Sequence, residues 1–159
     1  TQVHVIGFSA GGHLAASLAT QRGDETTDAP SLRSMALIYP VISHEKPIGN
    51  ALSTQSLLGN DPSADIIALH SPAQHVSADT PPGFFVHALD DVDVPSENSL
   101  LMVGAMQAAG RPAELHLFEA GGHGFGLGDP HLPVGHWIGL YCAWLDRNDS
   151  KQKSARDAR

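Results

Sequence analysis

Short runs of β-branched and other apolar residues alternate along this chain with longer segments whose apolar residues recur at helical spacing. The apolar runs predict four buried strands, over residues 3–8, 34–39, 84–88 and 114–118. The other segments predict helices that end near residue 20, cover 51–58 and 62–69, begin at Pro95, and cover 137–145. Strands that alternate with helices predict a parallel sheet with right-handed crossovers, and so a protein of the α/β class.

A single domain accounts for the 159 residues, because domains average about 150 residues. We place this domain over residues 1–146. Residues 41–82 interrupt the alternation of strands and helices, and we predict that they form a loop-like or lid-like insert. A loop is also predicted over residues 21–33, and residues 147–159 are predicted to form a polar tail.

The first candidate for chemistry is the segment Gly7-Phe8-Ser9-Ala10-Gly11, which has the form G-x-S-x-G and joins the first strand to the first helix. In this setting a sharp turn lifts a serine hydroxyl above a sheet as a nucleophile. The N–H of Ala10 then lies at a helix N-terminus, where it can stabilise a developing oxyanion. The alternative interpretation is a glycine-rich turn in which Ser9 caps the helix.

Two further candidates follow the third and fourth predicted strands. Acidic residues follow Leu89, and His123 lies in the glycine-rich segment 121–126. The carboxyl ends of parallel strands meet at one edge of a sheet, so a serine, an acid and a histidine are expected to converge there. In this chain order they predict a catalytic triad in which His123 takes the proton of Ser9 while the acid orients His123.

Asp90, Asp91 and Asp93 compete for the role of the acid. Asp91 fits best, because D-x-x-V-P places it directly after the strand and before the helix that begins at Pro95. Asp90 is the second choice, and capping of that helix is the simpler explanation of Asp93. Because three neighbouring carboxylates repel one another, at most one is expected to be buried against an imidazole.

Nine further histidines raise the question of a metal site. The sequence contains no H-E-x-x-H or H-x-H spacing, and its one cysteine, Cys142, has no partner, so neither a metal nor a cofactor is predicted. His13 and His87 lie close to the candidate site in the sequence. Packed and hydrogen-bonded imidazoles are the simpler interpretation of both.

Charge and composition narrow the classes of partner. Nine Lys and Arg residues against seventeen Asp and Glu residues give a formal net charge of −8, which argues against nucleic acid or an anionic membrane as a partner. No apolar run approaches the roughly 18 residues of a membrane span. The single cysteine and the lack of a visible leader favour a cytoplasmic location, while a signal peptide lost ahead of Thr1 would leave the same sequence.

From the elbow onward the chain resembles the α/β-hydrolase serine esterases of the acetylxylan esterase or endo-xylanase-like esterase family. The resemblance covers nearly all of the chain before the tail. It implies a carboxylesterase that acts on short acyl esters, such as the acetyl esters of xylan-type carbohydrates, without a cofactor. It also implies that Ser9, Asp91 and His123 form the triad. The segments that carry it are V-I-G-F-S-A-G-G-H-L-A (5–15), L-I-Y-P-V-I-S (37–43), S-P-A-Q-H-V (71–76), F-V-H-A-L-D-D-V-D-V-P-S-E-N-S (85–99) and E-L-H-L-F-E-A-G-G-H-G-F-G-L-G (114–128).

In one respect the chain departs from this family. The resemblance implies several strands before the elbow and an H-G-G-type segment that supplies a second oxyanion donor, and this sequence has neither. We therefore expect the chain to be the C-terminal part of an α/β-hydrolase, whose first strand has a bare apolar edge through which copies associate. Two other readings stay open: a serine peptidase of the prolyl-oligopeptidase type, and a fragment that folds without turnover.

Overall fold

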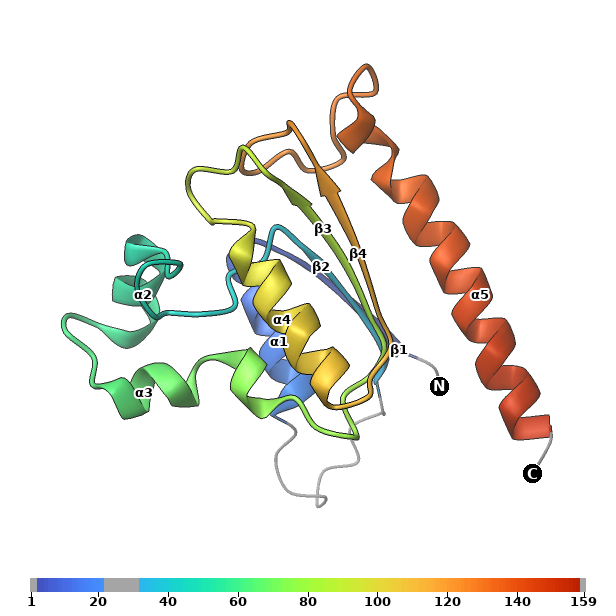
Figure 1. The fold of residues 1–159 in the computed structure, drawn as a ribbon, viewed down its shortest axis with the longest axis horizontal. Coiled ribbons are helices and arrows are strands. Elements are labelled where there is room, and N and C mark those ends of the chain that lie inside the picture. The colour runs from blue at the N-terminus through green and yellow to red at the C-terminus, as the bar shows by residue number, and fades with distance from the viewer. Residues whose placement is uncertain (1–2, 22–31, 158–159) are drawn as a thin grey trace.

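The computed structural model describes residues 3–21 and 32–157 (Figure 1). Its strands are β1 (Val3–Phe8), β2 (Leu32–Ile38), β3 (Gly83–Ala88) and β4 (Ala113–Phe118), which form one sheet in the order β1-β2-β3-β4. Every neighbouring pair of strands is parallel. The predicted parallel sheet of the α/β class is therefore confirmed, and the carboxyl ends of all four strands lie at one edge.

Helices cover both faces of this sheet (Figure 1). On one face, α1 (Ala10–Thr20) and α4 (Glu97–Ala108) pack their alanines and methionines against a cluster that includes Phe85. On the other face, the tryptophans of α5 (Trp137–Asp157) pack against a cluster that includes Phe84. Successive residues of a strand point to opposite faces, so β3 supplies both cores.

The remaining elements lie in the predicted insert and ahead of α5. The insert contains α2 (Ala51–Leu58), α3 (Ala64–Leu69) and the 3-10 turn η1 (Pro72–His75), and a second 3-10 turn, η2 (Pro133–His136), leads into α5. Neither α2 nor α3 buries a side chain. In Figure 1 both lie beside α1, away from the sheet. The position of α2 therefore depends on hydrogen bonds rather than on a hydrophobic core.

Two predicted boundaries near β2 and α4 are wrong by about two residues. β2 begins at Leu32 and ends at Ile38, because Tyr39 has a φ of 40° and leaves the extended conformation. The rest of the loop predicted over 21–33 lies outside the described residues, apart from its first position. The helix predicted from Pro95 begins at Glu97.

The last helix also differs from its predicted length. It was expected to end at residue 145, whereas α5 continues to Asp157 through most of the predicted polar tail. Lys, Gln, Ala and Arg in this segment favour the helical conformation. The side chain of Asn148 also donates to the main-chain oxygen of Trp144 (3.1 Å). A polar sequence after the last apolar residue is therefore compatible with a continued helix.

A glycine permits the close packing of the turn between β1 and α1. A Cβ atom on Gly7 would lie 2.6 Å from the carbonyl carbon of Gly11 and still closer to its oxygen. A Cβ atom on Gly11 would meet nothing within 4 Å. Packing therefore requires only the first of the two glycines in the G-x-S-x-G segment.

We expect Gly7→Ala to lower the free energy of unfolding by about 3 kcal/mol or more, because the added methyl group overlaps backbone that cannot move without displacing Ser9. Gly11→Ala is the matched control. It should be neutral or stabilising by up to about 1 kcal/mol, because alanine is favoured over glycine within a helix. Urea denaturation of both variants measures the difference. Equal stabilities would contradict this account of the turn.

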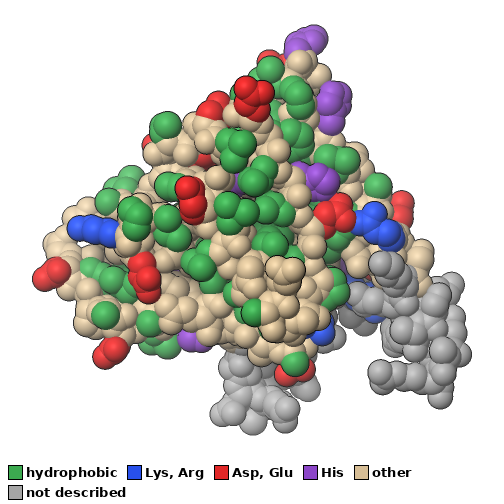
Figure 2. Space-filling view, in the orientation of Figure 1, with side chains coloured by type: hydrophobic (Ala, Val, Ile, Leu, Met, Phe, Trp, Pro, Cys, Tyr) green, Lys and Arg blue, Asp and Glu red, His purple; other side chains and the backbone are tan. Residues whose placement is uncertain are grey.

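Acidic residues outnumber basic ones in this chain, and β1 and β4 form the two edges of the described sheet. Among the described residues, β1 pairs only with β2, and Ile6 on β1 is 44% exposed. Association of copies through this edge stays a prediction. On the face in Figure 2, acidic side chains are spread widely, and the Lys and Arg side chains of the described residues do not gather into a patch. Across the described part of the chain, no helix has the length and apolar character needed to cross a bilayer.

Candidate active site

Ser9 is held in a strained conformation between β1 and α1. Its φ of 52° and ψ of −120° lie in a region that residues with a Cβ atom adopt only at an energetic cost. The N–H of Ser9 donates to the carbonyl of Ile38 at the end of β2 (3.0 Å), and the carbonyl of Ser9 accepts from the N–H of Val41 (3.2 Å). These bonds hold the backbone so that the side chain borders a cavity at the carboxyl edge of the sheet.

The structure brings Ser9, Asp91 and His123 together. Oγ of Ser9 lies 2.8 Å from Nε2 of His123, and Nδ1 of His123 lies 2.7 Å from Oδ2 of Asp91. Because a carboxylate only accepts, the proton of this imidazole is on Nδ1, and Nε2 offers its lone pair to the hydroxyl of Ser9. A general base that accepts a proton from serine requires this arrangement.

Asp91 is buried, and both of its carboxylate oxygens accept hydrogen bonds. Oδ1 accepts from the N–H groups of Asp93 (3.0 Å) and Val94 (2.8 Å), and Oδ2 accepts from His123. Nε2 of His87, which is also buried, lies 3.3 Å from Oδ2. These donors replace the water that an exposed carboxylate would bind, and so they stabilise its charge inside the protein.

The other two carboxylates of this loop have different surroundings. Oδ1 of Asp90 accepts from the N–H of Gly122 (2.8 Å), so Asp90 connects the loop after β3 to the loop that carries His123. This bond lowers the pKa of Asp90 below its usual value. Asp93 offers its main-chain carbonyl to the side chain of Asn50 (2.8 Å). Of the three candidates, the structure places only Asp91 against an imidazole.

Tyr39 supports the His123 loop, and it was not among the site residues predicted from the sequence. Its ring lies edge-on to that of His123, with centroids 5.1 Å apart, and its hydroxyl accepts from the N–H of Gly126 (3.1 Å). The carbonyl of Gly126 in turn accepts from the indole of Trp137 (3.0 Å). Burial raises the pKa of Tyr39, so its hydroxyl stays neutral. The sequence feature that could have identified it is an aromatic residue directly before Pro40, at the end of the strand next to β1.

Ala10 is the first residue of α1 and borders the cavity. The first N–H groups of a helix have no acceptor within the helix, so the N–H of Ala10 is available to an oxygen atom bound beside Ser9. The helix dipole favours negative charge at the same place. The structure thus puts Ala10 where the sequence placed it, next to the candidate nucleophile.

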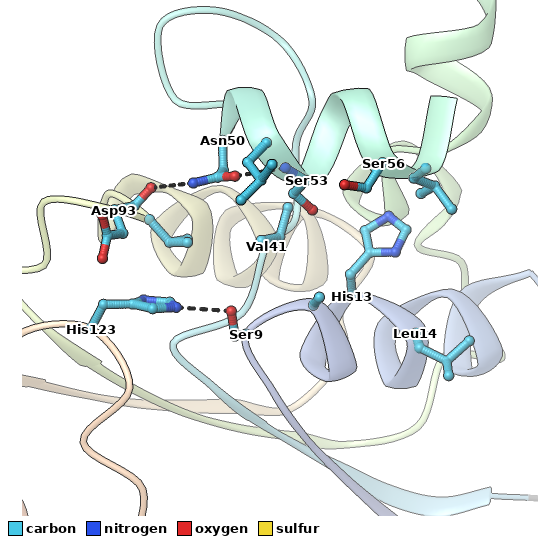
Figure 3. A pocket seen from close by; sticks show the side chains of 13 residues that line it. Ser9, His13, Leu14, Val41, Asn50, Ser53, Ser56, Asp93 and His123 are labelled. Atoms are coloured by element: carbon cyan, nitrogen blue, oxygen red, sulfur yellow. Dashed lines mark hydrogen bonds between the residues drawn. The ribbon is translucent and has the colours of Figure 1, made fainter. Parts of the chain in front are cut away.

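A cavity of about 720 Å³ opens beside Ser9, between the first turns of α1 and the overlying helix α2 (Figure 3). His123 stands at one end of it and His13 at the other. The bond from Asn50 to the loop after β3 ties the start of α2 to the rest of the site. The cavity is lined by Ser9, Ala10, His13, Leu14, Val41, Asn50, Leu52, Ser53, Ser56, Leu57, Asp93, Val94 and His123.

Two buried histidines, His13 and His44, form a second connection to α2. Nε2 of His13 lies 2.9 Å from the carbonyl of His70 and 3.3 Å from Nε2 of His44. The carbonyl can only accept, so His13 carries its proton on Nε2, and Nε2 of His44 is an acceptor. His44 therefore donates from Nδ1 to the hydroxyl of Thr54 in α2 (3.0 Å). In the described residues, no group of three or more His, Cys, Asp or Glu side chains is arranged to hold a metal ion.

The free energy of unfolding is expected to fall by up to about 3 kcal/mol as the pH drops from about 6.5 to about 4. Burial, together with the neighbouring His13 and His70, lowers the pKa of His44 to about 4. Between the two values the unfolded chain takes up a proton that the folded chain does not, so acid favours unfolding. Burial lowers the pKa of His13 in the same direction.

Urea denaturation at several pH values tests this expectation. His44→Gln should reduce the slope of stability against pH in this window, because glutamine does not titrate there. His131→Gln, in an exposed loop, is the control and should leave the slope unchanged. A wild-type stability that is constant from pH 6.5 to 4 would contradict a neutral His44.

A family model and two known proteins match most of this chain. The model of the prolyl oligopeptidase family matches residues 1–151. An acetylxylan esterase of Xylanibacter ruminicola is 35% identical over 130 residues, which cover 79% of this chain and 26% of that protein. Endo-1,4-beta-xylanase B of Butyrivibrio fibrisolvens is 31% identical over 142 residues, which cover 85% of this chain and 22% of that protein.

A solved structure shows the same fold. The crystal structure of an acetyl ester-xyloside bifunctional hydrolase from Caldicellulosiruptor lactoaceticus superposes with a TM-score of 0.83 and is 39% identical, covering 91% of this chain and 56% of that chain. The resemblance to acetylxylan esterases with an α/β-hydrolase fold is therefore confirmed. The chain spans about a quarter of the length of the two curated relatives and about half of the solved structure.

Proposed function

This chain belongs to the prolyl oligopeptidase family, and on that premise we propose that it carries the catalytic centre of a serine carboxylesterase that cleaves short acyl esters. The observation that supports this most is the continuous relay from Asp91 through His123 to Ser9, which opens into a cavity large enough for an ester. Hydrogen-bonded contact between nucleophile, base and orienting acid is the structural signature of covalent catalysis by serine.

The proposed reaction has two halves. Nε2 of His123 takes the proton of Ser9 while Oγ forms a bond to the ester carbonyl carbon, and the N–H of Ala10 donates to the oxyanion. The carbon–oxygen bond to the alcohol then breaks, and His123 gives its proton to the departing oxygen, which leaves an acylated Ser9. Water, deprotonated by His123, attacks the acyl carbon. The bond between this carbon and Oγ then breaks, His123 returns the proton to Ser9, and the acid is released. Asp91 stabilises the imidazolium that forms in each half.

For the substrate, we propose acetyl esters of xylan-type carbohydrates. The names of the relatives, acetylxylan esterase and acetyl ester-xyloside bifunctional hydrolase, support this class. The side chains of Ser53 and Ser56 on α2 lie over the cavity, and among the described residues their hydroxyls have no hydrogen-bond partner (Figure 3). Free hydroxyls of this kind can bind the hydroxyl groups of a sugar, which an apolar wall cannot.

A serine peptidase is the second candidate, because the matching family takes its description from prolyl oligopeptidase. The same relay cleaves amides and esters, so the two activities differ in the pocket and not in the triad. A third outcome, a chain that folds without turnover, follows if the site needs parts of the relatives that this chain does not span.

Substrate profiling separates these three outcomes. We expect measurable kcat/KM for acetylated xylo-oligosaccharides and for 4-nitrophenyl acetate, and none for a proline-containing peptide amide. Acetate release is measured, with the deacetylated oligosaccharide as the blank. Cleavage of the amide with little release of acetate would favour the peptidase. Failure on all three substrates by a folded chain would refute the proposed activity for this chain.

A further inference from the structure

Behind Asp91 lies a buried imidazole that the proposed reaction does not use. His87 is in β3, is fully buried, and is not among the residues that line the cavity. Its Nε2 lies 2.9 Å from the carbonyl of Val94 and 3.3 Å from Oδ2 of Asp91, and its Nδ1 lies 2.8 Å from the hydroxyl of Ser99. Both ring nitrogens therefore have partners.

The partners determine where the proton of His87 is. The carbonyl of Val94 can only accept, so Nε2 carries the proton and donates. Burial lowers the pKa of His87, which leaves the ring neutral, so Nδ1 accepts from the hydroxyl of Ser99. The N–H on Nε2 thus donates to Val94, and the same nitrogen lies 3.3 Å from Oδ2 of Asp91.

Oδ2 of Asp91 then has two imidazole nitrogens beside it. Nδ1 of His123 donates to it at 2.7 Å and Nε2 of His87 lies 3.3 Å away, while Oδ1 accepts from two backbone N–H groups. A carboxylate can rotate about its Cβ–Cγ bond, and three hydrogen bonds to its two oxygens, with the N–H group of His87 beside Oδ2, favour a single orientation. The imidazole of His123 takes its own orientation from that oxygen.

We propose that His87 is a positioning residue, whose N–H fixes Oδ2 of Asp91 and through it aligns His123 with Ser9. This inference rests on the proposed function. His87 takes up no proton during the reaction and contacts no substrate. Its loss should therefore lower kcat and leave KM unchanged, because KM depends on the cavity and kcat on the alignment of the base.

Two amide variants test the proposal. Gln places its amide nitrogen near the position of Nε2, whereas the shorter Asn side chain does not reach Asp91. We expect His87→Asn to lower kcat for 4-nitrophenyl acetate by about 10- to 100-fold, and His87→Gln to stay within about threefold of the wild type. Ser99→Ala is the control, because it removes only the partner on the far side of the ring.

A spectroscopic readout separates alignment from stability. The proton that His123 shares with Asp91 gives a far-downfield resonance in the proton NMR spectrum. We expect this resonance in the wild type and in His87→Gln, and its shift or loss in His87→Asn. Unchanged kcat and resonance in both variants would overturn the proposal, as would equal losses in both that follow their free energies of unfolding. A wild type without turnover that shows the expected resonance pattern would refute the esterase and leave the role of His87 standing.

Discussion

Ser9→Ala is expected to abolish covalent labelling by a fluorophosphonate and to lower kcat for 4-nitrophenyl acetate by about 10⁶-fold. The hydroxyl of Ser9 is the group that forms the covalent bond in the proposed reaction, and no neighbouring side chain can replace it. The change removes a single oxygen atom whose hydrogen-bond partner is His123, so the fold should be retained. Intact-mass spectrometry after labelling measures the effect directly.

Two comparisons make this result specific. Ser17→Ala changes a serine of α1 that lies outside the cavity, and it should label like the wild type. His123→Ala should slow labelling strongly, because Ser9 then lacks its base. Full labelling of Ser9→Ala would mean that another residue is the nucleophile and that the interpretation of the elbow is wrong.

The sequence alone predicted the fold well where local pattern and global topology agree. Short apolar runs that alternate with segments of helical periodicity are compatible with few folds other than a parallel α/β sheet. The bounds of β1 and β3 were predicted to within one residue. The carboxyl edge of such a sheet follows from topology. The convergence of Ser9 and His123, which are 114 residues apart, could therefore be predicted without coordinates.

Other parts of the site depend on contacts that no local pattern encodes. Tyr39 reaches the His123 loop through a residue 87 positions away, and His44 reaches α2 through Thr54. His87 was interpreted as a packed imidazole, and its position behind Asp91 follows from the turn after β3 rather than from spacing. The length of α5 was missed for a different reason, because the polar sequence of its last turns carries no apolar periodicity.

The three carboxylates after β3 show most clearly which part of the site the sequence predicts and which part only the structure shows. The distance from the strand and from Pro95 favoured Asp91 over Asp90. The sequence still left both residues as candidates for the acid. In the structure the adjacent side chains point to different loops: Asp91 bonds to His123 and Asp90 bonds to Gly122. Because adjacent side chains after β3 point in different directions, Asp91 contacts His123, whereas Asp90 bonds to the loop that carries His123.

Asp91→Asn is accordingly expected to lower kcat by about 10⁴-fold. An asparagine can still accept the N–H groups of Asp93 and Val94 with its amide oxygen. Its NH₂ group then faces His123 and donates to Nδ1, which moves the proton of the imidazole to Nε2. His123 then points an N–H at Ser9 instead of a lone pair, so it cannot act as the base.

The matched variant is Asp90→Asn, which changes the neighbouring residue in the same way. Its amide oxygen can still accept from the N–H of Gly122, so kcat should fall by less than about tenfold. Both variants are compared by kcat for 4-nitrophenyl acetate and by the rate of fluorophosphonate labelling. If Asp90→Asn lost the larger share of activity, the acid would be Asp90. Because the two substitutions remove the same charge from adjacent positions, a difference of about three orders of magnitude between them cannot arise from net charge. It would arise from which carboxylate the imidazole contacts.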